Sequence, residues 1–153
     1  MTAVAPDRLA EAKPSYAKPS PERSAIMRAI KGKDTKPELA VRSLLHRMGY
    51  RFRLHSKTLP GRPDLFLRRH SLAIFVHGCF WHRHANCKLA SDPKSNVAYW
   101  QEKFSRNRRR DRAARTALTK AGIKSLVLWE CEIRKGDAAT AAKLRAVLGD
   151  AAR

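Results

Sequence analysis

One short segment limits what this chain can become: Phe75-Val-His-Gly-Cys-Phe-Trp-His-Arg-His-Ala-Asn-Cys87, which directly continues an apolar run. The segment carries three histidines, two cysteines and two adjacent large aromatic residues. Thiolates and imidazoles bind zinc, and a histidine outside a metal shell can move a proton near neutral pH. The segment therefore predicts a functional site at the end of a buried strand.

Charge indicates the class of partner. The 153 residues include 33 Lys and Arg against 13 Asp and Glu, a formal charge of +20. This excess suits a polyphosphate, and we expect nucleic acid rather than a membrane surface, because neither end reads as a basic amphipathic helix with a large apolar face. Prolines and charges in residues 1–22 predict a flexible basic arm, neither signal peptide nor membrane span. We expect a cytoplasmic, nucleoid-associated protein with one domain at residues 23–153.

Periodicity and capping signals predict a mixed α/β fold. The long helix should carry Asn107 and Asp111 on its inward stripe, and polar groups on a core-facing side need partners, so this helix should pass a polar site. The last strand should be of the central type, and the strand at 72–76 should be buried on both faces. The expected elements are a short helix at 24–30, a helix from the capping box Thr35-Lys-Pro-Glu38 to Gly49, strands at 50–54, 64–67 and 72–76 with a hairpin across 68–71, a helix at 96–121, a strand at 123–129 and a helix at 138–148.

The three cysteines of the chain are the best evidence for a metal. Cys79, His84 and Cys87 lie close together in sequence, and Cys131 follows the end of the last predicted strand. Three thiols and one imidazole form a closed Cys₃His set, which is typical of structural zinc. Buried inert thiols are the alternative. We expect zinc, because cysteines that gather at strand ends by chance would be unusual.

An acidic residue at the start of a strand predicts a second metal. Asp64 ends the loop motif Gly61-Arg-Pro-Asp64, and the hairpin should carry it next to Val76 and His77. A carboxylate, a backbone carbonyl and an imidazole would then converge on one Mg²⁺. A simple turn carboxylate is the alternative for Asp64 taken alone.

Two histidines remain once zinc takes His84. Either His77 or His82 can act as general base or contact a phosphate. Asp111 lies in an arginine-rich run, so it either forms a salt bridge with Arg109 or Arg115 or orients His82.

Aromatic residues beside the predicted zinc loop have two interpretations. Phe80, Trp81 and Trp100 can all belong to the core, which is the usual place of aromatic side chains. However, Phe80 and Trp81 are adjacent in a tethered loop and cannot easily both face inward. A wedge that enters DNA suits such a rigid mount.

Ordered motifs in this chain resemble those of one family, the very-short-patch mismatch repair endonucleases (Vsr type). The resemblance runs from about residue 24 to residue 134. The shared motifs are M-R-A-I, K-D-T-K-P-E, G-R-P-D, F-V-H-G-C-F-W-H-R-H with a following cysteine, N-x-x-R-D and W-E-C.

The resemblance implies a restriction-endonuclease-like mixed sheet flanked by helices, with a structural zinc site. It implies an Mg²⁺-dependent endonuclease that nicks one strand 5′ to the thymine of a T:G mismatch arising from 5-methylcytosine deamination. The expected partners are double-stranded DNA with that mismatch and mismatch-repair proteins, and the expected state is a monomer. The alternatives are a zinc-stabilised, non-catalytic DNA-binding module and a restriction endonuclease of the same fold.

Residue roles also follow from the resemblance. A functional role for Glu38 depends on the resemblance most strongly, because the capping box alone explains a glutamate at this position. Val76 stands where some relatives carry a hydroxyl residue, and His84 and Cys87 are separated by two residues where one is also found. The implied roles are a Mg²⁺ carboxylate at Asp64 and a backbone carbonyl ligand at Val76, a general base at His82 with Asp111, His77 and Glu38 around it, zinc ligands at Cys79, His84, Cys87 and Cys131, and DNA-opening aromatics at Phe80, Trp81 and Trp100.

Overall fold

A four-stranded mixed sheet forms the centre of the molecule. The computed structural model describes residues 15–149. The strand order is β1-β2-β3-β4, with β1 and β2 antiparallel, β2 and β3 antiparallel, and β3 and β4 parallel. The strands are β1 (Arg53–Leu54), β2 (Leu65–Leu67), β3 (Leu72–His77) and β4 (Lys124–Trp129).

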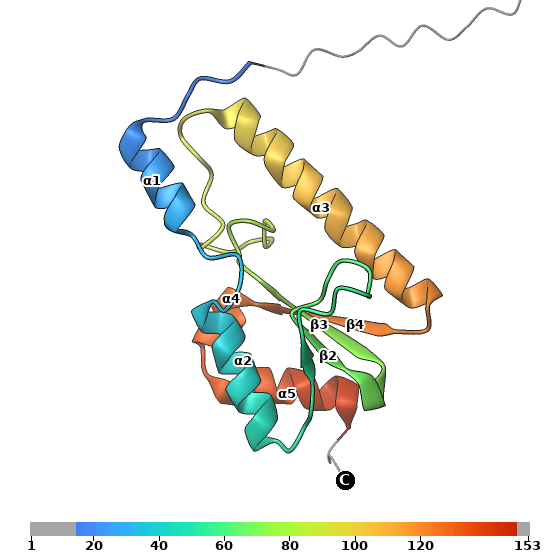
Figure 1. Cartoon of the computed structure of the whole chain (residues 1–153). Coiled ribbons are helices and arrows are strands. Elements are labelled where there is room, and N and C mark those ends of the chain that lie inside the picture. Colours follow the sequence, from blue (N-terminus) through green and yellow to red (C-terminus); the bar gives the residue numbers. More distant parts are fainter. Residues whose placement is uncertain (1–14, 150–153) are drawn as a thin grey trace, which may run out of the picture.

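Helices cover both faces of this sheet, so the expected mixed α/β fold with flanking helices is confirmed. Figure 1 shows α3 along one face and α2 with α5 along the other. No helix in the described part of the chain is long and apolar enough to cross a membrane. The helices are α1 (Pro21–Ala29), α2 (Lys36–Arg47), α3 (Val97–Lys120), α4 (Glu130–Arg134) and α5 (Asp137–Leu148), with a 3₁₀ turn, η1, at Arg68–His70.

The β3 strand has a continuous apolar sequence because it has no solvent face. Its Leu72 and Ile74 pack into the core formed with α2 and α5, whereas Ala73 and Phe75 pack toward α3. Side chains alternate across a strand, so a strand covered on both sides needs apolar residues at every position. This prediction is confirmed, as is the hairpin that joins β2 to β3.

Two helices follow their sequence signals closely. The Thr35 side chain caps α2 by accepting a hydrogen bond from the Glu38 amide at 3.5 Å. The helix ends before Gly49, whose φ of 85° is easily reached only by glycine. In α3, the stripe that begins at Trp100 faces inward as predicted.

Other expectations need correction. The strand expected at 50–54 contains only Arg53 and Leu54, and β4 lies at the edge of the described sheet rather than inside it. The β4 strand resembles a central strand because helices pack on both of its faces. Helix α4 was not predicted. Most of the arm expected at 1–22 lies outside the described residues, and Pro21 and Glu22 already belong to α1.

Candidate active site

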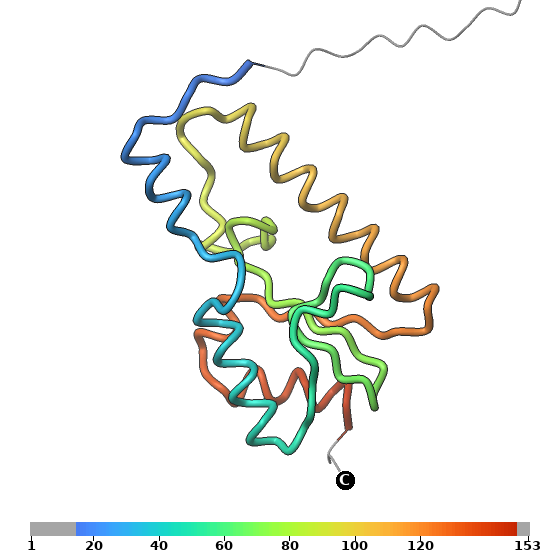
Figure 2. Tube along the Cα trace, in the orientation of Figure 1, coloured from blue at the N-terminus to red at the C-terminus, as the bar shows by residue number. Residues whose placement is uncertain are grey.

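Four metal-binding side chains meet beyond the carboxyl ends of β3 and β4. Parallel pairing of these strands places His77 beside Trp129, so the segments after both strands emerge together. Figure 2 shows the excursion between β3 and α3, residues 78–96, which contains neither helix nor strand. The ligand atoms of Cys79, His84, Cys87 and Cys131 all lie within 4.8 Å of one another.

This Cys₃His cluster fits a tetrahedral metal site. His84 Nδ1 lies 3.7 Å from Cys79 Sγ and 3.2 Å from Cys131 Sγ. Zinc–nitrogen and zinc–sulfur bond lengths predict about 3.6 Å between such atoms in a tetrahedron. Burial raises the pKa of the Cys79 thiol to about 12, so the metal-free cluster keeps that thiol protonated. The donor set and spacing suggest zinc, whose binding would release such protons.

An acidic group lies on the other side of β3. The hairpin places Asp64 beside Val76, whose amide donates a hydrogen bond to Asp64 Oδ2 at 2.7 Å. Burial raises the pKa of Asp64 to about 6, although the Val76 hydrogen bond opposes the rise. The contact uses the Val76 amide, and a metal-binding role for its carbonyl remains a prediction. A cation beside Asp64 would favour the charged carboxylate.

A glycine in the Gly61-Arg-Pro-Asp64 motif lets this loop approach α3 closely. Gly61 has a φ of 74°, and a Cβ built there would lie 2.5 Å from the Ala114 Cβ. Neither the conformation nor the space accommodates a side chain. Gly61 therefore helps to set the position of Asp64, the residue directly before β2.

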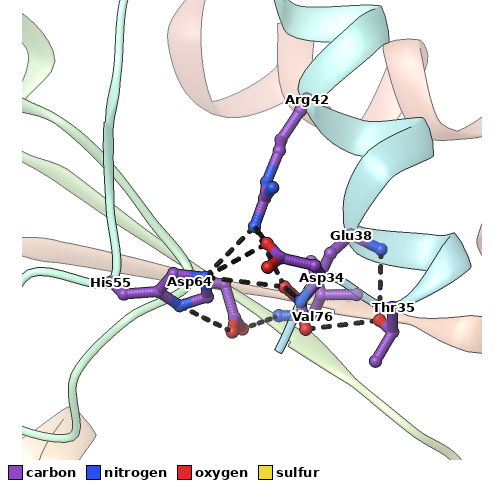
Figure 3. Close-up of polar contacts among 7 residues, drawn as sticks. All are labelled: Asp34, Thr35, Glu38, Arg42, His55, Asp64 and Val76. Carbon is purple, nitrogen blue, oxygen red and sulfur yellow. Dashed lines mark hydrogen bonds and ion pairs between the residues drawn. The ribbon is translucent and has the colours of Figure 1, made fainter. Parts of the chain in front are cut away.

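Around Asp64 lies a network that the sequence did not reveal (Figure 3). Glu38 is buried and accepts hydrogen bonds from the Asp34 amide at 3.0 Å and the Thr35 hydroxyl at 3.2 Å. Arg42 Nη2 lies 3.3 Å from Glu38 Oε2 and 2.7 Å from Asp34 Oδ1. Glu38 therefore does more than cap α2, because it also contacts Arg42. Of these contacts, only the capping-box spacing of Thr35 and Glu38 and the i,i+4 spacing of Glu38 and Arg42 are visible in sequence.

His55 completes this network and was also missed. Its Nε2 lies 3.1 Å from Arg42 Nη2, and its Nδ1 lies 4.0 Å from Asp64 Oδ1. His55 has a φ of 44°, in the left-handed region that β-strand residues avoid. A histidine directly after a two-residue strand gives no sequence signal for such a position.

A second constellation contains His77, His82 and Asp111. The two imidazole rings stack 3.7 Å apart at 7°, and His82 Nδ1 lies 2.6 Å from Asp111 Oδ2. Burial lowers the pKa of His77 to about 4, and the charge of His82 adds to this effect. Burial alone would raise the pKa of Asp111, but the hydrogen bond with His82 outweighs it and leaves that pKa lowered. Of the partners considered for Asp111, the structure places His82 against it.

The aromatic residues form one packed group. Phe80 lies 5.2 Å from Trp81 and 5.4 Å from Trp100, measured between ring centroids. Trp100 is only 6% exposed, so it is the buried support of the group, whereas Trp81 is half-buried and partly open to solvent. Asn107 donates a hydrogen bond to the Trp81 carbonyl at 3.1 Å. Both polar residues in the inward stripe of α3 therefore hold the segment after β3.

Most of the proposed catalytic groups and two of the aromatic residues reach one cleft of about 1550 Å³, whereas Arg42, His55, Phe80 and the Cys₃His cluster are not part of its lining. Its basic lining comes from α1 and the segment that follows it, and from α3. Acidic and imidazole groups thus lie at the base of a positively charged cleft, an arrangement suited to a nucleic-acid backbone. The site groups in its lining are Glu38, Asp64, Val76, His77, His82 and Asp111, and the aromatics are Trp81 and Trp100.

Comparison with known proteins agrees with this geometry. The family model described as DNA mismatch endonuclease Vsr matches residues 17–89. A type II nicking enzyme of Xanthomonas oryzae, V.XorIIP, is 50% identical over 115 residues, which cover 74% of this chain and 84% of that protein. The DNA mismatch endonuclease Vsr of Escherichia coli is 42% identical over 112 residues, which cover 73% and 71%.

The chain belongs to the Vsr family. It is therefore a DNA nicking endonuclease, which sets aside the non-catalytic DNA-binding module. Among solved structures, the catalytic domain of the homing endonuclease I-Bth0305I is similar, with 20% identity, a TM-score of 0.43 and coverage of 73% of this chain and 93% of that domain.

Proposed function

We propose that this Vsr-family chain nicks one DNA strand 5′ to the thymine of a T:G mismatch, in a reaction that requires Mg²⁺. Family membership supports both the endonuclease activity and a mismatched duplex as the substrate. The observation that carries the reaction is the pair of His82 and Asp111, 2.6 Å apart, in the same cleft as Asp64. Such a T:G pair arises when 5-methylcytosine in a C:G pair loses its amino group.

We assign proton transfer to His82. Its Nδ1 faces Asp111, which leaves Nε2 to accept a proton from the attacking water. The stacked His77 stays neutral near pH 7 because its pKa is about 4, so His82 can take up a proton without a second charge against it. The water oxygen bonds to phosphorus, the bond to the leaving oxygen breaks, and the water proton moves to His82.

Asp64 is the proposed magnesium ligand, together with the Val76 carbonyl, and Glu38 lies near this site without binding the ion. Bound Mg²⁺ would stabilise the charge that develops on the phosphate and the leaving oxygen. Asp64 suits this role because it is partly buried and its pKa of about 6 leaves it ionised at neutral pH. The Cys₃His cluster would hold structural zinc, which ties the Trp81 segment to β3 and β4.

Trp81 is the aromatic residue best placed to reach the bases. It lines the cleft, and Lys103 Nζ lies 5.2 Å from its ring centre, where it can neutralise an adjacent phosphate. The rings of Phe80 and Trp100 pack against the Trp81 ring and support it. We propose that Trp81 enters the stack beside the mismatch with this support.

One chain contains every proposed group, so a monomer is sufficient for a single nick. The substrate would be met on chromosomal DNA in the cytoplasm. Mismatch-repair proteins as further partners remain a prediction of the family resemblance.

The deciding experiment compares two end-labelled duplexes, one with a single T:G mismatch and one fully paired, with and without Mg²⁺. Both strands are resolved. We expect one nick, 5′ to the mismatched thymine, only with Mg²⁺. Cleavage of both strands of the paired duplex would instead indicate a restriction endonuclease, and metal-independent nicking would overturn the magnesium assignment.

A further inference from the structure

Arg42 has an unusual position among the acidic groups near Asp64. A single atom, Nη2, contacts Asp34 Oδ1 at 2.7 Å, Glu38 Oε2 at 3.3 Å and His55 Nε2 at 3.1 Å (Figure 3). The side chain is only 15% exposed, so solvent screens these contacts weakly. Arg42 therefore joins α2 to the loops before α2 and after β1.

The contact with His55 fixes which nitrogen of that ring carries the proton. A guanidinium only donates, so His55 Nε2 must accept, and the proton lies on Nδ1. That Nδ1 faces Asp64 Oδ1 at 4.0 Å. Arg42 thus orients two groups beside Asp64, the Glu38 carboxylate and the His55 ring.

The arrangement of these acceptors is one that a metal ion would also favour. Ligand atoms of Asp34, Glu38 and His55 lie within 4.8 Å of one another. Arg42 Nη2 already contacts all three, whereas Arg42 Nε is buried without a hydrogen-bond partner among the described residues. Leaving a buried donor unpaired is unfavourable. The side chain is placed for the Nη2 contacts at the expense of Nε.

We propose that Arg42 is a positioning residue that supplies a fixed cation to Asp34, Glu38 and His55 and so confines the divalent metal of the reaction to Asp64. The proposal rests on the magnesium site proposed above and adds a reason why Glu38, although adjacent to it, stays oriented by protein contacts. A divalent ion cannot occupy the same acceptors while a guanidinium remains there.

Manganese binding tests this without any turnover. The full-length, zinc-loaded protein is titrated with Mn²⁺, and free Mn²⁺ is measured by electron paramagnetic resonance. Replacement of Arg42 by Met removes the charge and keeps a long apolar side chain. We expect Arg42→Met to bind one additional Mn²⁺, or to bind Mn²⁺ at least about tenfold more tightly than the wild type. The double variant Arg42→Met/Glu38→Gln should lose this gain.

Arg47 provides the matched control on the same helix. It pairs with Asp137 and Ser43 at an exposed site away from the cleft. Arg47→Met should bind Mn²⁺ as the wild type does. Arg42→Lys keeps the charge and should also bind Mn²⁺ as the wild type does, because an ammonium still excludes a second cation. Zinc content and circular dichroism verify folding, and Arg42→Gln replaces Arg42→Met if the latter does not fold.

The outcomes separate this inference from the proposed function. Unchanged Mn²⁺ binding in folded Arg42→Met or Arg42→Gln would overturn the role of Arg42, even if the wild type nicks T:G duplexes. A gain of Mn²⁺ binding in a protein that nicks neither duplex would overturn the proposed function and retain the role of Arg42. A merely structural role would lower the melting temperature without the Glu38-dependent gain.

Discussion

Two clusters of metal-binding residue types lie at the same end of the sheet, and they differ in their donor atoms and in whether a protein cation is already present. The Cys₃His cluster offers three thiol sulfurs and one imidazole nitrogen, which together would complete a closed tetrahedral shell. The acidic cluster, formed by Asp34, Glu38 and Asp64 with Arg42 and His55, already contains its own cation and opens on the cleft. The comparison teaches that a metal would hold the fold together in the first cluster and perform chemistry in the second.

The largest effect should come from the acidic cluster. Asp64→Asn keeps the shape but removes the proposed metal charge partner, so we expect nicking of the T:G duplex to fall by at least about 1000-fold. Zinc content should not change, because the two clusters share no residue. Single-turnover nicking rates and bound zinc are measured together.

Asp92→Asn is the control for this change, since Asp92 pairs with Arg83 at an exposed site outside the proposed machinery. It should nick at the wild-type rate. Full activity in Asp64→Asn would contradict the metal assignment, and loss of zinc would contradict the independence of the clusters.

The opposite result is expected for the Cys₃His cluster. Cys131→Ser removes the one ligand contributed from beyond β4, so the segment after β3 would no longer be tied to α4. We expect loss of bound zinc and a fall in the free energy of unfolding by more than about 4 kcal/mol. Zinc analysis and denaturant unfolding check both. Arg134→Ala, on the exposed end of α4, should retain zinc, and a Cys131→Ser variant that also retained it would disprove the ligand set.

The acidic cluster should lower stability where the Cys₃His cluster raises it. The pKa of Asp64 rises from 3.8 to about 6 on folding, so in this range the folded protein binds more protons than the unfolded chain, and stability falls as pH increases. Without Mg²⁺, Asp64→Asn should stabilise the protein by about 2–3 kcal/mol at pH 8 and by about half as much at pH 5. Urea unfolding at both pH values measures the free energy of unfolding. A variant less stable than the wild type at pH 8 would contradict this prediction.

The sequence predicted the Cys₃His cluster better than the acidic one, for a physical reason. Cysteines are rare, so three of them at strand ends point to one another without knowledge of the fold. Carboxylates and arginines are common on any surface. The contacts of Arg42 with Asp34 and His55 depend on how two loops pack against α2, which no local pattern encodes.

The helices and strands also differed in how well the sequence predicted them. Helix α3 was predictable because its stripe spans many turns, and its two polar members, Asn107 and Asp111, signalled partners that the structure identifies as Trp81 and His82. Position within the sheet was not predictable. An apolar run shows that both faces are covered, but it does not show whether strands lie on both edges, so β4 was misplaced.

The smallest effect concerns Trp81, which connects the two clusters. The Cys₃His cluster fixes its segment, and the ring lines the cleft that the acidic cluster shares. Trp81→Ala should lower the preference for T:G over paired DNA about fivefold, or by about 1 kcal/mol. This is the low end for base stacking, because Phe80 remains as a partial platform. Nicking rates on both duplexes measure the preference, with Leu89→Ala in the same segment as the control. Equal losses on both duplexes would mean that Trp81 supports cleavage in general and does not produce the preference for the mismatch.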